Sequence, residues 1–106
     1  MAKYLVTGSY TSDGLKGVLK EGGSGRRKAV EDALKAMGGH LEAFYFAFGD
    51  NDVVTIIDLP DNVTAAALAI GISSSGTVGT KTTVLLSAEE IDQAAKKTVS
   101  FRPAGQ

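Results

Sequence analysis

The stretch that decides the fold is HLEAFYFAFGDNDVVTIIDLP, residues 40–60. It contains two apolar runs, His40–Phe48 and Asp52–Leu59, which are separated by Gly49-Asp50-Asn51. A short loop of Gly, Asp and Asn between two such runs is typical of a β-hairpin. We expect Gly49 to hold a positive φ in this turn, because glycine adopts that conformation freely.

On the N-terminal side, a strand and an interrupted helix precede the hairpin. Lys3–Tyr10 is predicted to form the strand, and Ser12 is a suitable N-cap for the helix that follows. The run Gly22-Gly23-Ser24-Gly25 interrupts this helix, and Gly38-Gly39 ends its second piece. The second piece repeats apolar residues at helical spacing, which indicates one buried face. These residues are Val30, Ala33, Leu34 and Met37.

On the C-terminal side, the pattern predicts a helix, a strand, a last helix and a tail. The first helix runs from Val63 to about Ser75 and is apolar nearly all round, so we expect it to be buried on every side. Thr77–Leu86 is a β-branched strand. The run Ser87-Ala88-Glu89-Glu90 has the spacing of a capping box, which opens the last helix. The expected inner stripe of that helix is Ile91, Ala94 and Ala95.

The order of elements is therefore β-α-β-β-α-β, followed by a C-terminal helix and an extended tail. This order predicts an α+β, ferredoxin-like fold, in which a four-stranded antiparallel sheet carries its helices on one face. The 106 residues fit one domain that spans residues 1–106.

Composition excludes several classes of site and partner. The absence of Cys rules out disulfides and thiolate metal sites, and a single His rules out a multi-histidine metal site within one chain. The formal net charge of −1 gives no reason to expect binding to nucleic acid or to a membrane surface. The N-terminal apolar run is too short for a signal peptide, so the cytoplasm is the predicted compartment.

The two hairpin strands carry apolar residues on both faces. Strict alternation predicts that Phe44, Phe46 and Phe48 point one way and that Leu41, Ala43, Tyr45 and Ala47 point the other way. In the second strand, Val54 and Ile56 likewise oppose Val53 and Ile57. Helices on one side leave the other face as an apolar patch of a size that monomers rarely tolerate. A second subunit, the terminal helix or a ligand cavity would cover it.

Self-association is the most economical of these solutions, because closed homo-oligomers are common. We expect a homo-oligomer that uses the sheet face, the Ala-rich helix over residues 63–75 and the C-terminal tail. In the tail, Phe101 can bury a large ring and Arg102 can bind a carboxylate or carbonyl groups. We therefore predict that the tail crosses a subunit boundary, with docking on its own subunit as the alternative.

The run Leu41–Val53, the Gly38-Gly39 before it and the Ala-rich helix together resemble the GYD domain family. Gly49 and Asp52 match the family's Gly-x-Tyr-Asp-like turn, whereas Asn51 stands where the family often has Tyr. The resemblance covers essentially the whole chain, including the tail. It implies a ferredoxin-like domain of the dimeric α/β-barrel type and of prokaryotic origin, and it brings no activity or set of catalytic residues.

A Gly-rich break before Arg26, Arg27 and Lys28 is the first candidate site. A helix N-terminus suits a phosphate or carboxylate, so these residues are candidates for binding an anion. The spacing is not that of a nucleotide-binding loop, since Ala29 follows Lys28, and we expect no cofactor. The alternative is a flexible helix break with solvated charges.

His40 is the one weak catalytic candidate, and its place at a strand start after two glycines favours a surface role. Tyr4, Phe44, Tyr45 and Phe46 are candidates for an aromatic ligand pocket, with core or subunit packing as the alternative. The turn residues Gly49, Asp50, Asn51 and Asp52 lack the calcium-loop pattern, so we interpret them as structural.

Two classes of function remain open. The first is a self-associating module without catalytic activity that binds a small anionic or aromatic ligand or a protein. The second is a small cofactor-independent enzyme, by analogy with dimeric α/β-barrel monooxygenases and isomerases, and that analogy rests on fold alone. A deep cleft that encloses His40 or a tyrosine hydroxyl would favour the enzyme, and a dry, filled sheet interface would favour the module.

Overall fold

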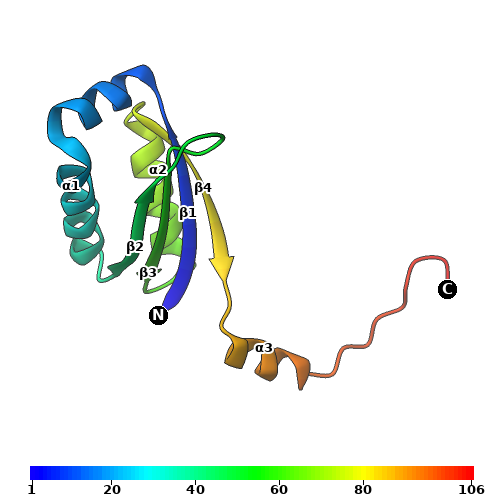
Figure 1. The fold of residues 1–106 in the computed structure, drawn as a ribbon. Helices are drawn as coiled ribbons and strands as arrows, with labels where there is room; N and C mark the ends of the chain where they lie inside the picture. The colour runs from blue at the N-terminus through cyan, green and yellow to red at the C-terminus, as the bar shows by residue number, and fades with distance from the viewer.

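The computed structural model describes residues 1–106 and contains four strands and three helices (Figure 1). In chain order these are β1 (Ala2–Tyr10), α1 (Ser12–Ala36), β2 (His40–Phe46), β3 (Val53–Leu59), α2 (Asn62–Ser74), β4 (Val78–Leu85) and α3 (Ala88–Ala95). No helix has the length and apolar character needed to span a membrane.

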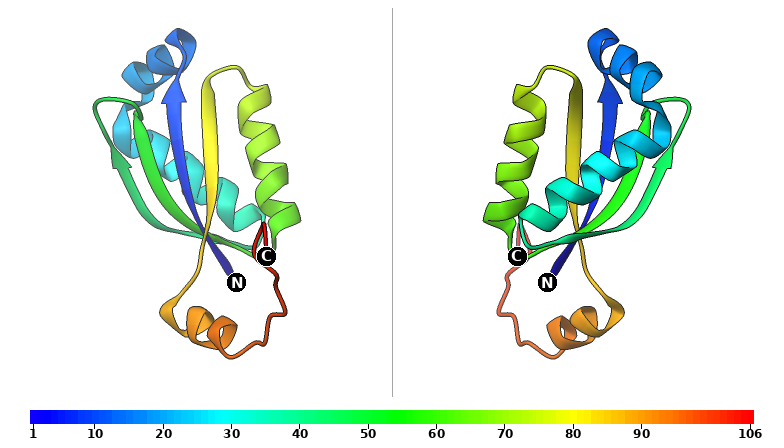
Figure 2. Two further views of the ribbon diagram at one scale, coloured as in Figure 1. Left: turned by 90° about the vertical axis from the view of Figure 1, so that its right-hand side faces the viewer. Right: turned by 90° about the vertical axis from the view of Figure 1, so that its left-hand side faces the viewer.

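The strands form one antiparallel sheet in the order β2-β3-β1-β4. Both α1 and α2 lie on the same side of this sheet, α1 toward β2 and α2 toward β4 (Figure 2). This arrangement confirms the predicted ferredoxin-like α+β fold. It also leaves the opposite side of the sheet without a helix, and we call that side the open face.

Local sequence signals explain where the helices begin and bend. The N-cap of α1 is Thr11, one residue before the predicted Ser12, and its hydroxyl accepts a hydrogen bond from the Gly14 amide at 3.2 Å. The predicted break in α1 is confined to Gly22, which has a positive φ of 79° while the residues after it are helical. Asp61 caps α2, and the Thr64 hydroxyl and amide that donate to its carboxylate lower the pKa of Asp61.

A β-bulge at Glu42 corrects the predicted alternation of β2. The pairing runs Leu41 with Ile57 and then Ala43 with Ile56, so one residue of β2 has no partner between them. Leu41 consequently packs against the core on the same side as Phe44 and Phe46, and not with Ala43 and Tyr45 as strict alternation predicts. The alternation of β3 was predicted correctly, since Val53 and Ile57 are buried under the helices while Val54 and Ile56 lie on the open face.

The hairpin loop is longer than predicted. Strand pairing ends at Phe46 and Val53, and the Ala47 amide closes the loop by donating to the Asp52 carbonyl at 2.9 Å. Ala47 and Phe48 therefore lie beyond the strand, and Phe48 is fully exposed. Gly49 has the expected positive φ, at 116°.

The turn residues hold the hairpin loop against the end of β1. The Asp52 amide donates to the Gly8 carbonyl at 2.8 Å, and the Asp52 carboxylate accepts from the Tyr10 amide at 2.8 Å. The Ser9 hydroxyl adds a bond to the Asp50 carbonyl at 3.0 Å. These contacts fix the hairpin loop to the end of β1.

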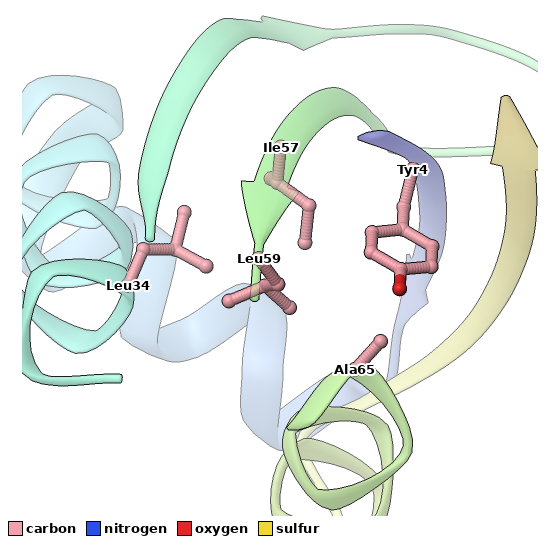
Figure 3. Packing of buried hydrophobic residues seen from close by; sticks show 5 residues of the cluster. All are labelled: Tyr4, Leu34, Ile57, Leu59 and Ala65. Atoms are coloured by element: carbon pink, nitrogen blue, oxygen red, sulfur yellow. The ribbon is translucent and has the colours of Figure 1, made fainter. Parts of the chain in front are cut away.

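The core is small and lies at one end of the sheet, under both helices (Figure 3). It consists of five buried residues, Tyr4, Leu34, Ile57, Leu59 and Ala65. Leu34 is the one large side chain that α1 buries completely. The Tyr4 hydroxyl donates to the Asn62 side chain at 2.6 Å, so its polar end is satisfied at the start of α2.

The composition of the Ala-rich helix α2 predicts that it is buried on every side, and this prediction is wrong. Ala65 is its one buried residue, while Val63 and Ile70 are exposed. The reason is geometric, because a single sheet offers one surface to the helix and nothing in this chain covers its outer side. The apolar outer side of α2 therefore faces solvent in the isolated chain.

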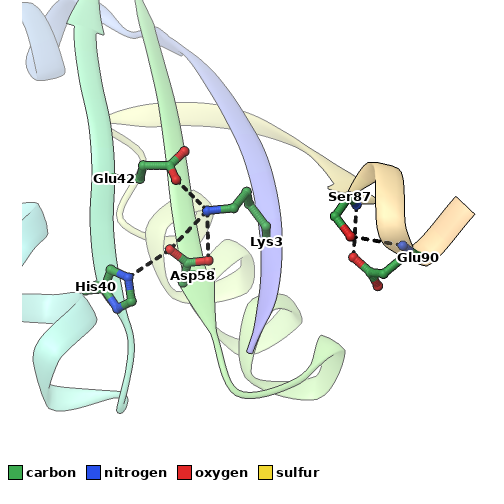
Figure 4. Close-up of polar contacts among 6 residues, drawn as sticks. All are labelled: Lys3, His40, Glu42, Asp58, Ser87 and Glu90. Atoms are coloured by element: carbon green, nitrogen blue, oxygen red, sulfur yellow. Dashed lines mark hydrogen bonds and ion pairs between the residues drawn. The ribbon is translucent and has the colours of Figure 1, made fainter. Parts of the chain in front are cut away.

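Residues 86–106 leave the body of the molecule, and we call them the arm. The arm extends on the side of the open face in the views of Figures 1 and 2. Its helix α3 begins with the predicted capping box, in which the Glu90 amide donates to the Ser87 hydroxyl at 3.1 Å and the Ser87 amide donates to the Glu90 carboxylate at 3.0 Å (Figure 4). The predicted inner stripe of α3 is exposed, since no residue of α3 is buried.

Candidate functional site

A cavity of about 150 Å³ lies between the sheet and the two helices. Every strand contributes to its floor, and both helices contribute to its walls, mainly through aliphatic and aromatic side chains. The lining includes Tyr10, Arg26, Val30, Ala33, Phe44 and Leu68. A mostly apolar concavity with few polar groups is the usual form of a small-molecule site.

The polar groups of this cavity are few. The Thr55 hydroxyl donates to the Val6 carbonyl at 2.9 Å and is therefore already satisfied. Arg26 is the one charged residue in the lining, and its side chain is 31% exposed. Its Nη1 lies 3.4 Å from a carboxylate oxygen of Glu21, which is long for a charge-assisted hydrogen bond.

The three basic residues of the predicted anion site do not converge. Arg27 pairs with Glu31 one turn later at 3.6 Å, and it borders a separate surface groove beside β2. Lys28 pairs with Asp32 at 2.6 Å, and this contact raises the pKa of Lys28. Both of these pairs lie on exposed helix surface, so Arg26 alone joins the cavity.

The four predicted aromatic ligand residues are also divided. Phe44 lines the cavity, and the ring of Phe46 meets it edge to face with a centroid distance of 5.2 Å. Tyr4 belongs to the core instead, because its ring and hydroxyl are both enclosed there. Tyr45 points to the open face and is 69% exposed.

A cluster of charged side chains lies at one end of the open face (Figure 4). His40, Asp58 and Lys3 are direct partners across β2, β3 and β1. The Asp58 carboxylate, whose side chain is 11% exposed, lies 2.9 Å from His40 Nε2 and 3.1 Å from Lys3 Nζ. Lys3 Nζ also contacts the bulged Glu42 at 2.6 Å. Glu42 and then Asp58 raise the pKa of Lys3 by accepting hydrogen bonds from its ammonium group.

This charged cluster has part of the chemistry of a catalytic site. A carboxylate that holds an imidazole can orient a general base. However, the bulge turns His40 away from the cavity. The hydroxyls of Ser74 and Ser75 at the end of α2 donate to the Gly71 and Ile72 carbonyls at 3.0 and 2.6 Å. The structure therefore brings no nucleophile to His40 and gives it a pairing role on the open face.

The row of Lys3, Asp58 and His40 was missed by the sequence analysis. The sequence does contain information that predicts this row. Each of the three residues lies near an end of its predicted strand, and the three strands are neighbours in a ferredoxin-like sheet. The bulge at Glu42 hides this signal, since strict alternation places His40 on the helix side.

Comparison with protein families matches residues 4–95 to the GYD domain. No curated protein and no solved structure matches the chain. The matched range begins in β1 and ends with α3, so the tail, which the sequence resemblance had included, lies outside it. Because the match extends over most of the 106 residues, the chain belongs to the GYD domain family.

Proposed function

We propose that this chain is a self-associating module, in which two copies pack through the open faces of their sheets. The observation that carries the proposal is the surface of the isolated chain. It exposes 7372 Å², whereas a compact monomer of 10.9 kDa exposes about 5,600 Å². The radius of gyration is 17.0 Å, compared with about 13 Å for a compact chain of this length.

The size of the excess suits a protein interface. It is about 1,800 Å², and a standard interface buries about 800 Å² on each partner. Much of the exposed apolar surface lies outside the helix-covered side, at Tyr45 on the open face and at Ile91, Val99 and Phe101 in the arm. The open face and the arm thus offer enough surface for a second copy.

The chemistry of the open face also supports self-association. Its centre carries Leu5, Ala43, Val54 and Ile56 from three neighbouring strands. The charged groups at its end are already paired within the chain, as Asp58 is with both Lys3 and His40. Burial of this end of the face therefore leaves Asp58, Lys3 and His40 with partners, which avoids the high cost of an isolated buried charge there.

The enzyme alternative lacks such support. It requires a cleft around a general base, and His40 lies on the opposite side of the sheet from the cavity. Tyr10 does contribute to the cavity lining, but no acidic or basic partner accompanies it there except Arg26. No observation selects a reaction.

Replacing Tyr45 with glutamate tests the open face. Tyr45 is 69% exposed in the isolated chain, so Tyr45→Glu leaves the fold intact but places a charge in the proposed interface. We expect the parent chain to show the mass of two or more copies in light scattering at micromolar concentration. Tyr45→Glu should raise the dissociation constant of the assembly at least about tenfold over that of the parent. A tenfold increase corresponds to a loss of about 1.4 kcal/mol of association free energy.

The control is Leu19→Glu, which introduces the same glutamate at a residue of α1 that is 85% exposed. It should keep the assembly of the parent. A parent chain that is monomeric at micromolar concentration would contradict self-association, and equal dissociation of both variants would contradict the use of the open face.

We further infer that the tail of the arm contacts the second copy. The tail has no hydrogen bond to the body, and Phe101 is 78% exposed, so the isolated chain offers no docking within its own subunit. Truncation after Ser100 is expected to lower the assembled mass or the melting temperature in a concentration-dependent way. Removal of residues 104–106 alone should have little effect, because it keeps the Phe101 ring and Arg102. A truncated chain with the mass and concentration dependence of the parent would disprove this role.

A further inference from the structure

The cavity joins two features that the sequence had suggested at separate places. An arginine from the predicted anion site and an aromatic residue from the predicted ligand pocket, Arg26 and Phe44, line the same space. They come from α1 and β2, on the helix side of the sheet, away from the open face. The cavity is thus independent of the surface proposed for self-association.

The dimensions and walls of the cavity define the body of a ligand. Protein interiors are normally packed without voids much larger than a water molecule, and an apolar void destabilises the fold unless something fills it. The volume here is about 150 Å³, and an apolar cavity of that size accepts one benzene-sized ring. Small residues on the wall, Ala29 and Ala33 of α1 and Gly8 of β1, keep this space open.

The charge at the edge of the cavity defines the head of the ligand. A guanidinium carries five N–H donors in a planar fork that matches a carboxylate. Arg26 uses one of its nitrogens, in the 3.4 Å contact with Glu21. Its neighbours Arg27 and Lys28 do not line the cavity, and they pair with carboxylates one turn later on the same helix, with Glu31 at 3.6 Å and with Asp32 at 2.6 Å. Most of the Arg26 fork therefore remains available toward the cavity.

We propose that the cavity binds a small aromatic carboxylate, whose ring lies among Val30, Phe44 and Leu68 and whose carboxylate binds Arg26. The ring fits an apolar wall that already contains aromatic edges, where aromatic pairs gain more than area burial alone. The carboxylate replaces Glu21 as the partner of Arg26. One ligand binds per chain, whatever the number of chains in the assembly.

The experiment compares phenylacetate with its neutral analogue phenylacetamide by titration calorimetry and by amide chemical shifts of the labelled chain. Phenylacetate should bind saturably with one site per chain and at least about tenfold more tightly than the amide, since the two differ in the charge that Arg26 recognises. The shift changes should cluster on α1 and β2 around Arg26 and Phe44.

Three variants separate the parts of the site. Arg26→Gln should weaken phenylacetate to the affinity of the amide, while Arg27→Gln, a neighbour that lies outside the cavity, should bind phenylacetate like the parent. Ala33→Leu fills the cavity from the same helix and should abolish binding of both compounds. Circular dichroism checks that each variant is folded.

Two results would overturn the proposal. One is the absence of saturable phenylacetate binding to the folded parent at millimolar concentrations. The other is phenylacetate binding that neither Arg26→Gln nor Ala33→Leu changes, because the ligand would then occupy another surface.

Discussion

Replacing Gly14 with alanine is expected to destabilise the fold by about 3 kcal/mol, at the upper end of the usual cost of overpacking. A Cβ at this position would overlap the backbone carbonyl oxygen of Thr77. That oxygen also accepts hydrogen bonds from the amide and the hydroxyl of Thr11 at 2.9 and 3.2 Å. The first turn of α1 is therefore fixed against the loop before β4, and backbone rather than a flexible side chain must move.

Gly17→Ala is the matched control for Gly14→Ala, in the same half of α1. No atom lies within 4 Å of the Cβ that it would add, so the helix gains the propensity difference between Ala and Gly, about 0.8 kcal/mol. Denaturant unfolding should therefore give midpoints that move in opposite directions for the two variants. Two midpoints that move together would show that α1 does not approach Thr77 closely in solution.

Replacing Leu34 with alanine is expected to cost about 3 kcal/mol, within the range for a leucine that loses its side chain in a core. Leu34 is fully buried and packs in the cluster with Ile57 and Leu59 of β3 (Figure 3). It is the largest contribution of α1 to a core of only five residues. Few other contacts of α1 are available to compensate for its loss.

Leu19→Ala makes the same chemical change on the same helix and serves as the control. Leu19 is 85% exposed, so the free energy of unfolding should change by less than about 0.5 kcal/mol. Calorimetry or denaturant unfolding at one protein concentration measures both variants. Equal losses for Leu34→Ala and Leu19→Ala would mean that α1 packs on the sheet through a different face.

The fold could be predicted from the sequence because its signals are local. Asp61 and the Ser87 capping box mark helix starts, and Gly49 with its polar neighbours marks the hairpin turn. The end of β2 could not be placed, since the apolar residues Ala47 and Phe48 continue the strand pattern although pairing stops at Phe46. Pairing depends on the partner strand, which local composition does not contain.

The candidate site could be predicted only in parts. Arg26, Arg27 and Lys28 have the same local chemistry, and the phase of α1 relative to the sheet selects Arg26 for the cavity. The sequence suggested an aromatic pocket, but the position of Tyr4 on β1 places it in the core while Phe44 reaches the cavity. Such distinctions depend on register and on helix orientation, which are tertiary properties.

The bulge at Glu42 changes how sequences of this kind should be aligned. Side chains alternate between the two faces of a sheet along a strand. One additional residue in the strand therefore moves the side chain of every position before it to the opposite face. His40 meets Asp58 on the open face only because that residue is present, and Leu41 reaches the core for the same reason. A relative that is one residue shorter between the glycines at 38–39 and Phe44 would carry its equivalent of His40 toward the helices. Gap placement at this point therefore decides whether two aligned histidines occupy the same chemical environment.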